Sequence, residues 1–288
     1  MPLSILSLHE AKALTESENG WKTTSVRTIA RSGISCKSSV HWILRSKLKC
    51  CPYKMKVMQE LKDSDFQKRL DFANDFTENF LDELDYVIWS DEAYFYLDGS
   101  VHTQNAYIWS SDNPHEFVTK PLHSEKICVW FAFSAKIVVP PVVIEKGTLD
   151  GDGYLDILQN HLVPYLKSHR LCSKSIYRHD GAPPHVKGNV QQFLKNTFGE
   201  ERLISRFNLH AWPPRSPDLS PVDFWFWGNL KRLVYSLGLP KSKSELAERI
   251  REKSSQNTKA DIEAANKNFL DRLLYVTEED GRHFEHLM

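Results

Sequence analysis

Three aspartates interrupt apolar stretches of the sequence, and this pattern constrains the fold more than any other feature. Asp91 and Asp180 each close a short β-type run, and Asp223 stands in the first turn of an expected helix. That helix start is marked by Ser220 as the N-cap and Pro221 as the first helical residue. A carboxylate at the end of a buried strand is costly unless it is paired or bound to a metal. We therefore expect the three side chains to meet, in an arrangement suited to divalent cations.

Each of these acids also has an ordinary structural explanation. Asp91 precedes a segment that is typical of a β-hairpin, and Asp180 followed by Gly181 is typical of a turn. Asp223 occupies the third helical position after Ser220, where an acid completes a capping box without any chemistry. The spacing alone leaves the catalytic and the structural interpretation open.

The chain from Tyr86 onward alternates between strand and helix patterns. Strands are expected at 86–90, 92–97, 105–110, 126–134, 136–144, 175–179 and 203–207, and helices at 154–167, at 186–198 and from 220 onward. The Pro140-Pro141 pair indicates an edge strand or a bulge. Meandering strands followed by a β-α-β-α succession predict a mixed α/β sheet with helices packed on it.

The formal net charge conceals a strong asymmetry. Lys and Arg number 37, as do Asp and Glu, and this balance argues against a nucleic-acid-binding protein. The segment 21–58 nevertheless has nine basic residues and no acidic one, whereas 60–85 has nine acids. Apolar residues in 60–85 recur with helical spacing, which predicts an amphipathic helix whose acidic face is solvated.

The basic segment has the pattern of a helix-turn-helix. Two short helices are expected at 25–31 and 37–48, separated by a break that contains Gly33. In such a motif the second helix lies in the major groove of DNA. The residues expected to contact DNA are Arg27, Lys37, Ser38, Ser39, His41, Arg45, Lys47 and Lys49. A basic helical hairpin without DNA-binding function fits the same pattern.

Several classes of protein are excluded by composition. The most apolar uninterrupted run, Ile127–Phe133, is far shorter than the roughly 20 residues of a membrane span. The first ten residues have no basic region and include Glu10, which is unlike a secretory signal. Five irregularly spaced cysteines without a C-x-x-C motif indicate neither a disulfide scaffold nor a zinc site.

Three blocks of sequence resemble the catalytic blocks of Tc1/mariner-type transposases, in the Tc3-like branch with aspartate as the third acid. They read VIWSDEAYFYLDG at 87–99, YRHDGAPPHV at 177–186 and WPPRSPDLSPVDFWFWGNLK at 212–231. The resemblance implies a ribonuclease-H-like mixed α/β sheet flanked by helices, preceded by a small all-α helix-turn-helix module. It also implies a catalytic, metal-binding triad of Asp91, Asp180 and Asp223 that holds two Mg²⁺ or Mn²⁺ ions.

The same resemblance implies the reaction. Metal-activated water cuts double-stranded DNA at the terminal inverted repeats, and the freed 3′-hydroxyl attacks a target phosphodiester. No organic cofactor, covalent protein–DNA intermediate or membrane is implied, and the expected location is the nucleus, with a homodimer as the expected assembly.

Asp218 is a rival third acid, which the resemblance places in a structural loop role. Glu92 and His185 lie beside the first two acids, as supporting residues or as ordinary packing and capping residues.

The resemblance suggests five segments: an uncertain 1–20, a helix-turn-helix module 21–58, an acidic linker helix 59–85, a catalytic domain 86–240 and a helical segment 241–288. Three tryptophans, Trp212, Trp225 and Trp227, are expected in the core rather than stacked on nucleic acid. The family's first helix-turn-helix and the basic linker after it are not found upstream, which predicts a truncated or decayed copy.

Two other functions share some of these features. A non-catalytic DNA-binding protein derived from a decayed or domesticated transposon would retain the basic segment and lose the chemistry. A metal-dependent nuclease or phosphatase unrelated to mobile DNA would share the acids, although it does not explain the helix-turn-helix pattern.

Overall fold

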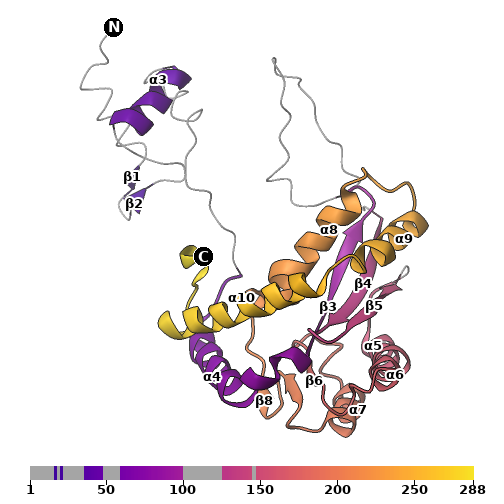
Figure 1. Cartoon of the computed structure of the whole chain (residues 1–288). Coiled ribbons are helices and arrows are strands. Elements are labelled where there is room, and N and C mark those ends of the chain that lie inside the picture. Colours follow the sequence, from indigo (N-terminus) through magenta and orange to yellow (C-terminus); the bar gives the residue numbers. More distant parts are fainter. Residues whose placement is uncertain (1–15, 18–19, 22–35, 48–58, 100–124, 145–146) are drawn as a thin grey trace. The chain divides into compact units, whose positions relative to one another are not determined.

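The computed structural model describes residues 16–17, 20–21, 36–47, 59–99, 125–144 and 147–288 (Figure 1). The chain divides into two units, Met1–Val57 and Met58–Met288. No helix among the described residues is both long enough and apolar enough to cross a membrane.

The first unit contains one described helix and a small two-stranded sheet. Strands β1 (Glu16–Ser17) and β2 (Gly20–Trp21) pair in antiparallel fashion. Helix α3 (Lys37–Trp42) continues directly into a π-helical turn, Ile43–Lys47. Val40 and Ile43 are fully buried, as expected for the apolar face of the second helix of the motif. The helix predicted at 25–31 lies outside the described residues.

The second unit is built on a six-stranded mixed sheet of the ribonuclease-H-like kind. Its strands are β3 (Val87–Tyr96), β4 (Lys126–Phe133), β5 (Val138–Ile144), β6 (Ile176–Arg178), β7 (Leu203–Ser205) and β8 (His210–Ala211), in the spatial order β5-β4-β3-β6-β7-β8. The pairs from β5 to β3 are antiparallel, and those from β3 to β8 are parallel. The predicted mixed α/β sheet is confirmed.

Strand β3 differs from its predicted form. The sequence predicted one strand ending at Ser90 and a second beginning at Glu92, whereas the structure has a single strand with Asp91 in its middle. The strand continues because β4 pairs with it on both sides of Asp91, which lies opposite Phe131. Pro140 lies in edge strand β5, beside a register shift between Trp130 and Ala132, as its position in the sequence predicted. The predicted strand 105–110 lies outside the described residues.

Helices cover both faces of the sheet (Figure 1). One layer consists of α5 (Gly151–Ile157), the π-helical turn Leu158–Leu162, α6 (Val163–Ser168) and α7 (Gly188–Phe198). The other layer consists of α4 (Asp63–Asn79), α8 (Trp227–Tyr235), α9 (Lys243–Ser254) and α10 (Lys259–Glu278). Because successive strand residues point to opposite faces, Ile88 packs in the first layer and Trp89 in the second.

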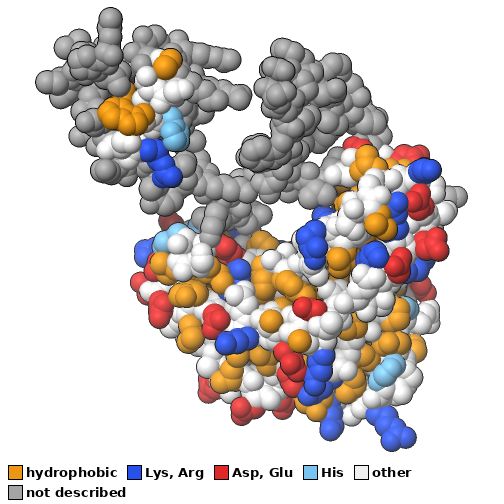
Figure 2. Space-filling view, turned by 45° about the horizontal axis from the view of Figure 1, so that its top comes forward, with side chains coloured by type: hydrophobic (Ala, Val, Ile, Leu, Met, Phe, Trp, Pro, Cys, Tyr) orange, Lys and Arg blue, Asp and Glu red, His pale blue; other side chains and the backbone are white. Residues whose placement is uncertain are grey.

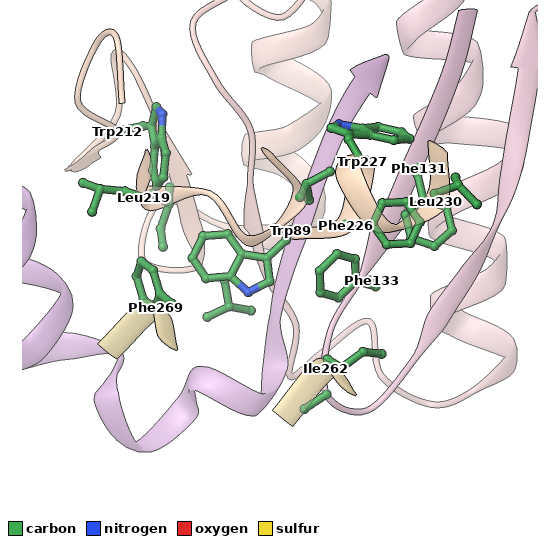
Figure 3. Packing of buried hydrophobic residues seen from close by; sticks show 14 of the residues in the cluster. Trp89, Phe131, Phe133, Trp212, Leu219, Phe226, Trp227, Leu230, Ile262 and Phe269 are labelled. Carbon is green, nitrogen blue, oxygen red and sulfur yellow. The ribbon is translucent and has the colours of Figure 1, made fainter. Parts of the chain in front are cut away.

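The larger hydrophobic cluster joins sheet and helices around aromatic rings (Figure 3). The rings of Phe131 and Phe226 stack with centroids 4.0 Å apart, which attaches the segment before α8 to β4. Trp89 packs edge-on against Phe269 of α10 at 4.8 Å. Trp212 and Trp227 are buried and Trp225 is partly buried against the cluster, so the core placement predicted for all three is confirmed.

Helix α4 is an integral part of the second unit. Its Phe72 and Phe76 are buried in the main cluster, and it packs against α10 and β8. The prediction that its acidic face is solvated is wrong at Asp65, whose side chain is fully buried beside Arg215. Elsewhere on the second unit, the face shown in Figure 2 intersperses Lys and Arg side chains with Asp and Glu.

Candidate active site

The three aspartates singled out in the sequence line a single open pocket of about 400 Å³, together with Arg178. Asp91 projects from the middle of β3, and Asp180 follows the end of the adjacent parallel strand β6. Asp223 lies in the π-helical turn Val222–Phe226, which leads into α8. The fold therefore brings together three residues that are separated in the chain by 88 and by 42 intervening residues.

Asp91 is the most deeply desolvated of the three carboxyl groups. Its Oδ2 atom accepts a hydrogen bond from Nε1 of Trp227 at 3.0 Å. Burial raises the pKa of Asp91 well above its usual range, and the nearby charges of Asp223 and Glu92 raise it further. The positive charge of Arg178 opposes this rise without cancelling it, so the ionised form of Asp91 is unfavourable in the metal-free pocket.

Asp223 interacts directly with Asp91. Its carboxyl group interacts with that of Asp91 and with Ser220, the residue expected to cap the helix, whose carbonyl oxygen accepts a hydrogen bond from the Asp223 amide at 2.9 Å. Burial raises the pKa of Asp223, and the positive charge of Arg178 opposes that rise. Two partly buried carboxyl groups thus interact at one side of the pocket.

Asp180 is held in a different environment. Its Oδ1 atom accepts hydrogen bonds from the Ala182 amide at 2.9 Å and from Nδ1 of His185 at 2.6 Å. Burial alone would raise the pKa of Asp180, but the His185 contact outweighs burial and lowers it. Asp180 is therefore the acid that stays ionised most readily.

His185 links two acids beside the pocket. Its Nε2 atom lies 3.2 Å from Oε1 of Glu92, and its ring packs against that of Tyr154 in a tilted contact with centroids 4.1 Å apart. Burial opposes protonation of His185, but the hydrogen bonds to Asp180 and Glu92 raise its pKa to about 10. A protonated imidazole donates from both nitrogens, so His185 fixes both carboxylates. The structure thus places both predicted supporting residues, Glu92 and His185, in contact beside the pocket.

Arg178 was not anticipated from the sequence. It is the last residue of β6 and is 2% exposed, and its guanidinium lies over the ring of Trp212 at 3.6 Å. Its Nη1 atom donates to the carbonyl oxygen of Ser90 and to Oγ of Ser220, each at 3.3 Å. One sequence feature could have identified this residue: an arginine at a position of a buried strand where an apolar side chain is usual.

A chain of buried hydroxyl groups behind Asp180 was also not anticipated. Oγ of Ser90 donates to the Tyr177 hydroxyl at 2.9 Å, and that hydroxyl lies 2.8 Å from the Tyr154 hydroxyl. Tyr154 continues the chain to Nδ1 of His179 at 3.2 Å. Burial lowers the pKa of His179 well below its usual range, so this ring is neutral. The network connects the middle of β3 to the end of β6, where the two strands support the pocket.

The rival third acid, Asp218, lies in a different setting. Both of its carboxylate oxygens accept hydrogen bonds from Arg69, at 2.8 and 2.6 Å. Arg69 is fully buried and also donates to Oγ of Ser216 and to the carbonyl oxygen of Gly281. Asp218 therefore joins α4 to the loop before α8 and is not among the residues that line the pocket.

The residues predicted to contact DNA are only partly described. Ser38, His41 and Arg45 are exposed on the helical stretch Lys37–Lys47, and Ser39 is half-buried with its Oγ 3.2 Å from Sγ of Cys36. Lys37 and Lys47 lie within the same stretch, and Arg27 and Lys49 lie outside the described residues.

The donor set of the pocket fits hard divalent cations. Carboxylate oxygens are the ligands that Mg²⁺ and Mn²⁺ prefer, and Mg²⁺ is commonly held by one or two carboxylates with water and phosphate oxygens as its other ligands. Within the described part of the chain, no three His, Cys, Asp or Glu side chains gather closely enough to enclose one ion. The buried pair Asp91 and Asp223 supplies the unbalanced negative charge that a bound cation would offset.

Comparison with known proteins supports a transposase relationship. The chain is 29% identical over 218 residues to the Tc3 transposase of Caenorhabditis elegans, covering 75% of this chain and 56% of that protein. It is 31% identical over 148 residues to the Tcb1 transposase of Caenorhabditis briggsae, covering 50% of each. The chain thus spans about half the length of the curated relatives it matches. No family model matches it.

Solved structures show the same fold. A Mos1 transposase paired-end complex with the left transposon end superposes with a TM-score of 0.73 at 17% identity, covering 96% of this chain and 80% of that one. The catalytic domain of the Mos1 mariner transposase matches with a TM-score of 0.61 at 17% identity, covering 80% of this chain and 100% of that one. The resemblance to Tc1/mariner-type transposases is confirmed.

Proposed function

Because the chain is related to Tc1/mariner-type transposases, we propose that it is a metal-dependent DNA transposase that cuts and joins the ends of a mobile element. The observation on which this rests is the shared pocket of Asp91, Asp180 and Asp223. The scissile phosphodiester of double-stranded DNA would enter this pocket, at the terminal inverted repeats and then at the target site.

The residues of this chain would hold the metal ligands in place before substrate binds. His185 and the Ala182 amide orient Asp180, and Trp227 orients Asp91 through its indole N–H. Ser220 and the start of the helical segment orient Asp223. Such prepositioning is what phosphoryl transfer chiefly requires from a protein.

Asp91, Asp180 and Asp223 are the residues that would bind two Mg²⁺ or Mn²⁺ ions. When bound, the ions would lower the pKa of the attacking water or 3′-hydroxyl and stabilise charge on the phosphodiester. Mos1 mariner paired-end complexes have been solved with Mn and with Mg, which agrees with this choice of metal.

The proposal is tested by incubating purified protein with Mn²⁺ or Mg²⁺ and duplex DNA that carries the candidate terminal repeats. We expect nicking that is lost in Asp91→Ala and Asp180→Ala and kept in Asp82→Ala, a change of an exposed acid on the same unit. Absence of nicking by the parent chain, or nicking that survives both pocket changes, would reject catalysis at this pocket.

The second candidate is a non-catalytic DNA-binding protein derived from such an element. It is favoured by the exposed Ser38, His41 and Arg45 on α3 and the turn that follows it, within a basic segment that has no acid. It predicts salt-sensitive DNA binding that survives the changes at Asp91 and Asp180, without nicking. The two candidates are therefore separated by the same set of variants.

Assembly and location belong to the same proposal. Mos1 structures are described as paired-end complexes, which supports a homodimer that brings two DNA ends together. Light scattering of the protein with and without end DNA measures the expected dimer. A nuclear location follows from the DNA substrate and is tested by imaging a tagged chain.

A further inference from the structure

Arg178 is a fixed positive charge among the three aspartates to which the proposed mechanism gives no role. The residue is 2% exposed, and Trp212 covers one face of its guanidinium at 3.6 Å. Nη1 makes two long hydrogen bonds of 3.3 Å, and Nε has no hydrogen-bond partner among the described residues. A buried charge with so few strong partners is unfavourable unless nearby charges of opposite sign offset it.

The negative charges that offset Arg178 are those of the three pocket aspartates. Asp223, Asp180 and Asp91 each interact electrostatically with the guanidinium, in that order of strength. Arginine stays protonated in proteins, so its charge is constant over the physiological pH range. Arg178 also lowers the pKa of each of the three carboxyl groups, which means that it favours their ionised forms.

A direct role in gripping DNA phosphate does not fit this geometry. Bidentate recognition of a phosphate needs a freely accessible guanidinium edge, whereas Arg178 is 2% exposed, with its Nη1 bonded to Ser90 and Ser220 and one face covered by Trp212. Arg206 lines the same pocket and is exposed, so the chain has an accessible arginine for that purpose. The charge of Arg178 therefore acts on the pocket from within the protein.

We infer that Arg178 is the internal counter-ion of the aspartate pocket: it holds the three carboxylates together in the metal-free protein and weakens the binding of divalent cations. The inference rests on the proposed metal site. A divalent cation in the pocket is repelled by Arg178 and attracted by the acids. Because Arg178 and the three aspartates line the same pocket, its unit charge acts on any cation bound there through a medium that screens charge less than water does. The protein can thus fold without a metal ion in the pocket, and a bound ion can dissociate reversibly.

The test measures Mn²⁺ binding to the full chain by isothermal titration calorimetry, which needs no DNA and no turnover. In Arg178→Gln we expect Mn²⁺ to bind about tenfold more tightly or better, because the repulsive charge is gone. The charge-preserving Arg178→Lys should stay within about threefold of the parent. The matched control Arg206→Gln, a solvent-screened charge of the same pocket, should change the affinity much less.

Thermal unfolding gives a second readout. Without metal, Arg178→Gln should lower Tm by about 5 °C or more, and saturating Mn²⁺ should raise its Tm by more than it raises that of the parent. If Arg178→Gln does not fold, the charge-balanced Arg178→Gln/Asp223→Asn variant should fold. Failure of that double variant as well would show that Arg178 acts through packing on Trp212, and would overturn the inference.

The outcomes separate this inference from the proposed function. Mn²⁺ binding by the parent that is lost in Asp180→Ala, combined with unchanged affinity in Arg178→Gln, would overturn the counter-ion role alone. No Mn²⁺ binding by the parent would overturn both the metal site and the inference. Tighter binding in Arg178→Gln with near-parental binding in Arg178→Lys is the result that supports it.

Discussion

Arg69 and Asp218 form a two-pronged ion pair inside the protein, with N–O distances of 2.8 and 2.6 Å. Arg69 is fully buried and the Asp218 side chain is 13% exposed, so the pair is largely shielded from solvent. The ion pair thus connects α4, which carries Arg69, to the loop before α8, which carries Asp218. Asp223, five residues further along the chain, does not bond to Arg69 and instead lines the pocket.

The two acids should respond to neutralisation in opposite ways. Asp218→Asn leaves Arg69 as a buried charge without its partner, which should lower the free energy of unfolding by about 3–5 kcal/mol. Asp223→Asn removes a desolvated carboxyl group whose pKa is raised, so metal-free stability should be unchanged or higher. Urea unfolding of both variants in chelator measures the difference. Equal losses in the two variants would show that Asp223 is structural.

The ion pair between Asp65 and Arg215 should make stability depend on pH. Burial raises the pKa of Asp65, but its hydrogen bond with Arg215 outweighs burial and lowers it. A lowered pKa gives stability that is present above the unfolded value of about 3.9 and is lost as the pH falls through the folded value. Asp65→Asn should cost about 3 kcal/mol at pH 7, and this difference from the parent should shrink below pH 4.

Urea unfolding at pH 7, 5 and 3 checks this dependence. Asp71→Asn, an exposed acid on the same helix, serves as the control and should show no comparable loss. A difference between Asp65→Asn and the parent that persists unchanged at pH 3 would contradict the assigned direction of the pKa shift.

The contact of His185 with Asp180 should matter for metal binding. His185→Gln removes a charged donor that fixes the Asp180 carboxylate, and the loss of such an outer partner typically costs about 10–100-fold in metal affinity. Glu92→Gln should cost less, because its contact with His185 is longer, at 3.2 Å. Mn²⁺ titration measures both, with the exposed His169→Gln as a control. Parental affinity in His185→Gln would show that His185 only packs on Tyr154.

The three aspartates of this site were predicted from the sequence. The contacts that hold them, and Arg178, were not, for physical reasons. An acid that interrupts an apolar run is visible in a sequence, so Asp91 and Asp180 could be identified. Their contacts with Trp227 and His185 depend on how segments far apart in the chain meet, and side-chain pairing of that kind leaves no local pattern. Arg178 was missed because a single polar residue in a three-residue strand does not change its apolar periodicity.

The packing of helices α4 and α10 against the sheet was harder to predict than the pocket. The segment 60–85 has helical spacing, yet only the tertiary contacts of Phe72, Phe76 and the buried Asp65 and Arg69 show that it is part of the core. The segment 241–288 was expected to be helical, and its contribution to the main cluster through Phe269 follows from the tertiary fold alone. A period of 3.6 residues indicates an apolar face without indicating what covers it.

Helix α10 should therefore be required for the pocket's stability. Phe269 packs edge-on against Trp89 and Phe76, at 4.8 Å from each ring. Phe269→Ala should lower the free energy of unfolding by about 3–5 kcal/mol, through lost burial and the cavity left behind. Leu274→Ala on the same helix, at a side chain that is 64% exposed, should change it by less than about 0.5 kcal/mol. Equal effects would mean that α10 does not pack on the sheet as described.

The exposed face of the helical stretch Lys37–Lys47 should determine DNA affinity independently of the pocket. Arg45→Ala removes one cation from a basic segment, so binding to duplex DNA should weaken and the slope of log K against log salt should fall by about 1. Fluorescence anisotropy at several salt concentrations measures both quantities. Arg251→Ala, an exposed arginine on α9, is the matched control, and Asp91→Ala should bind like the parent. If Arg45→Ala leaves both affinity and slope unchanged while Arg251→Ala reduces them, DNA is bound by the second unit and the helix-turn-helix assignment is wrong.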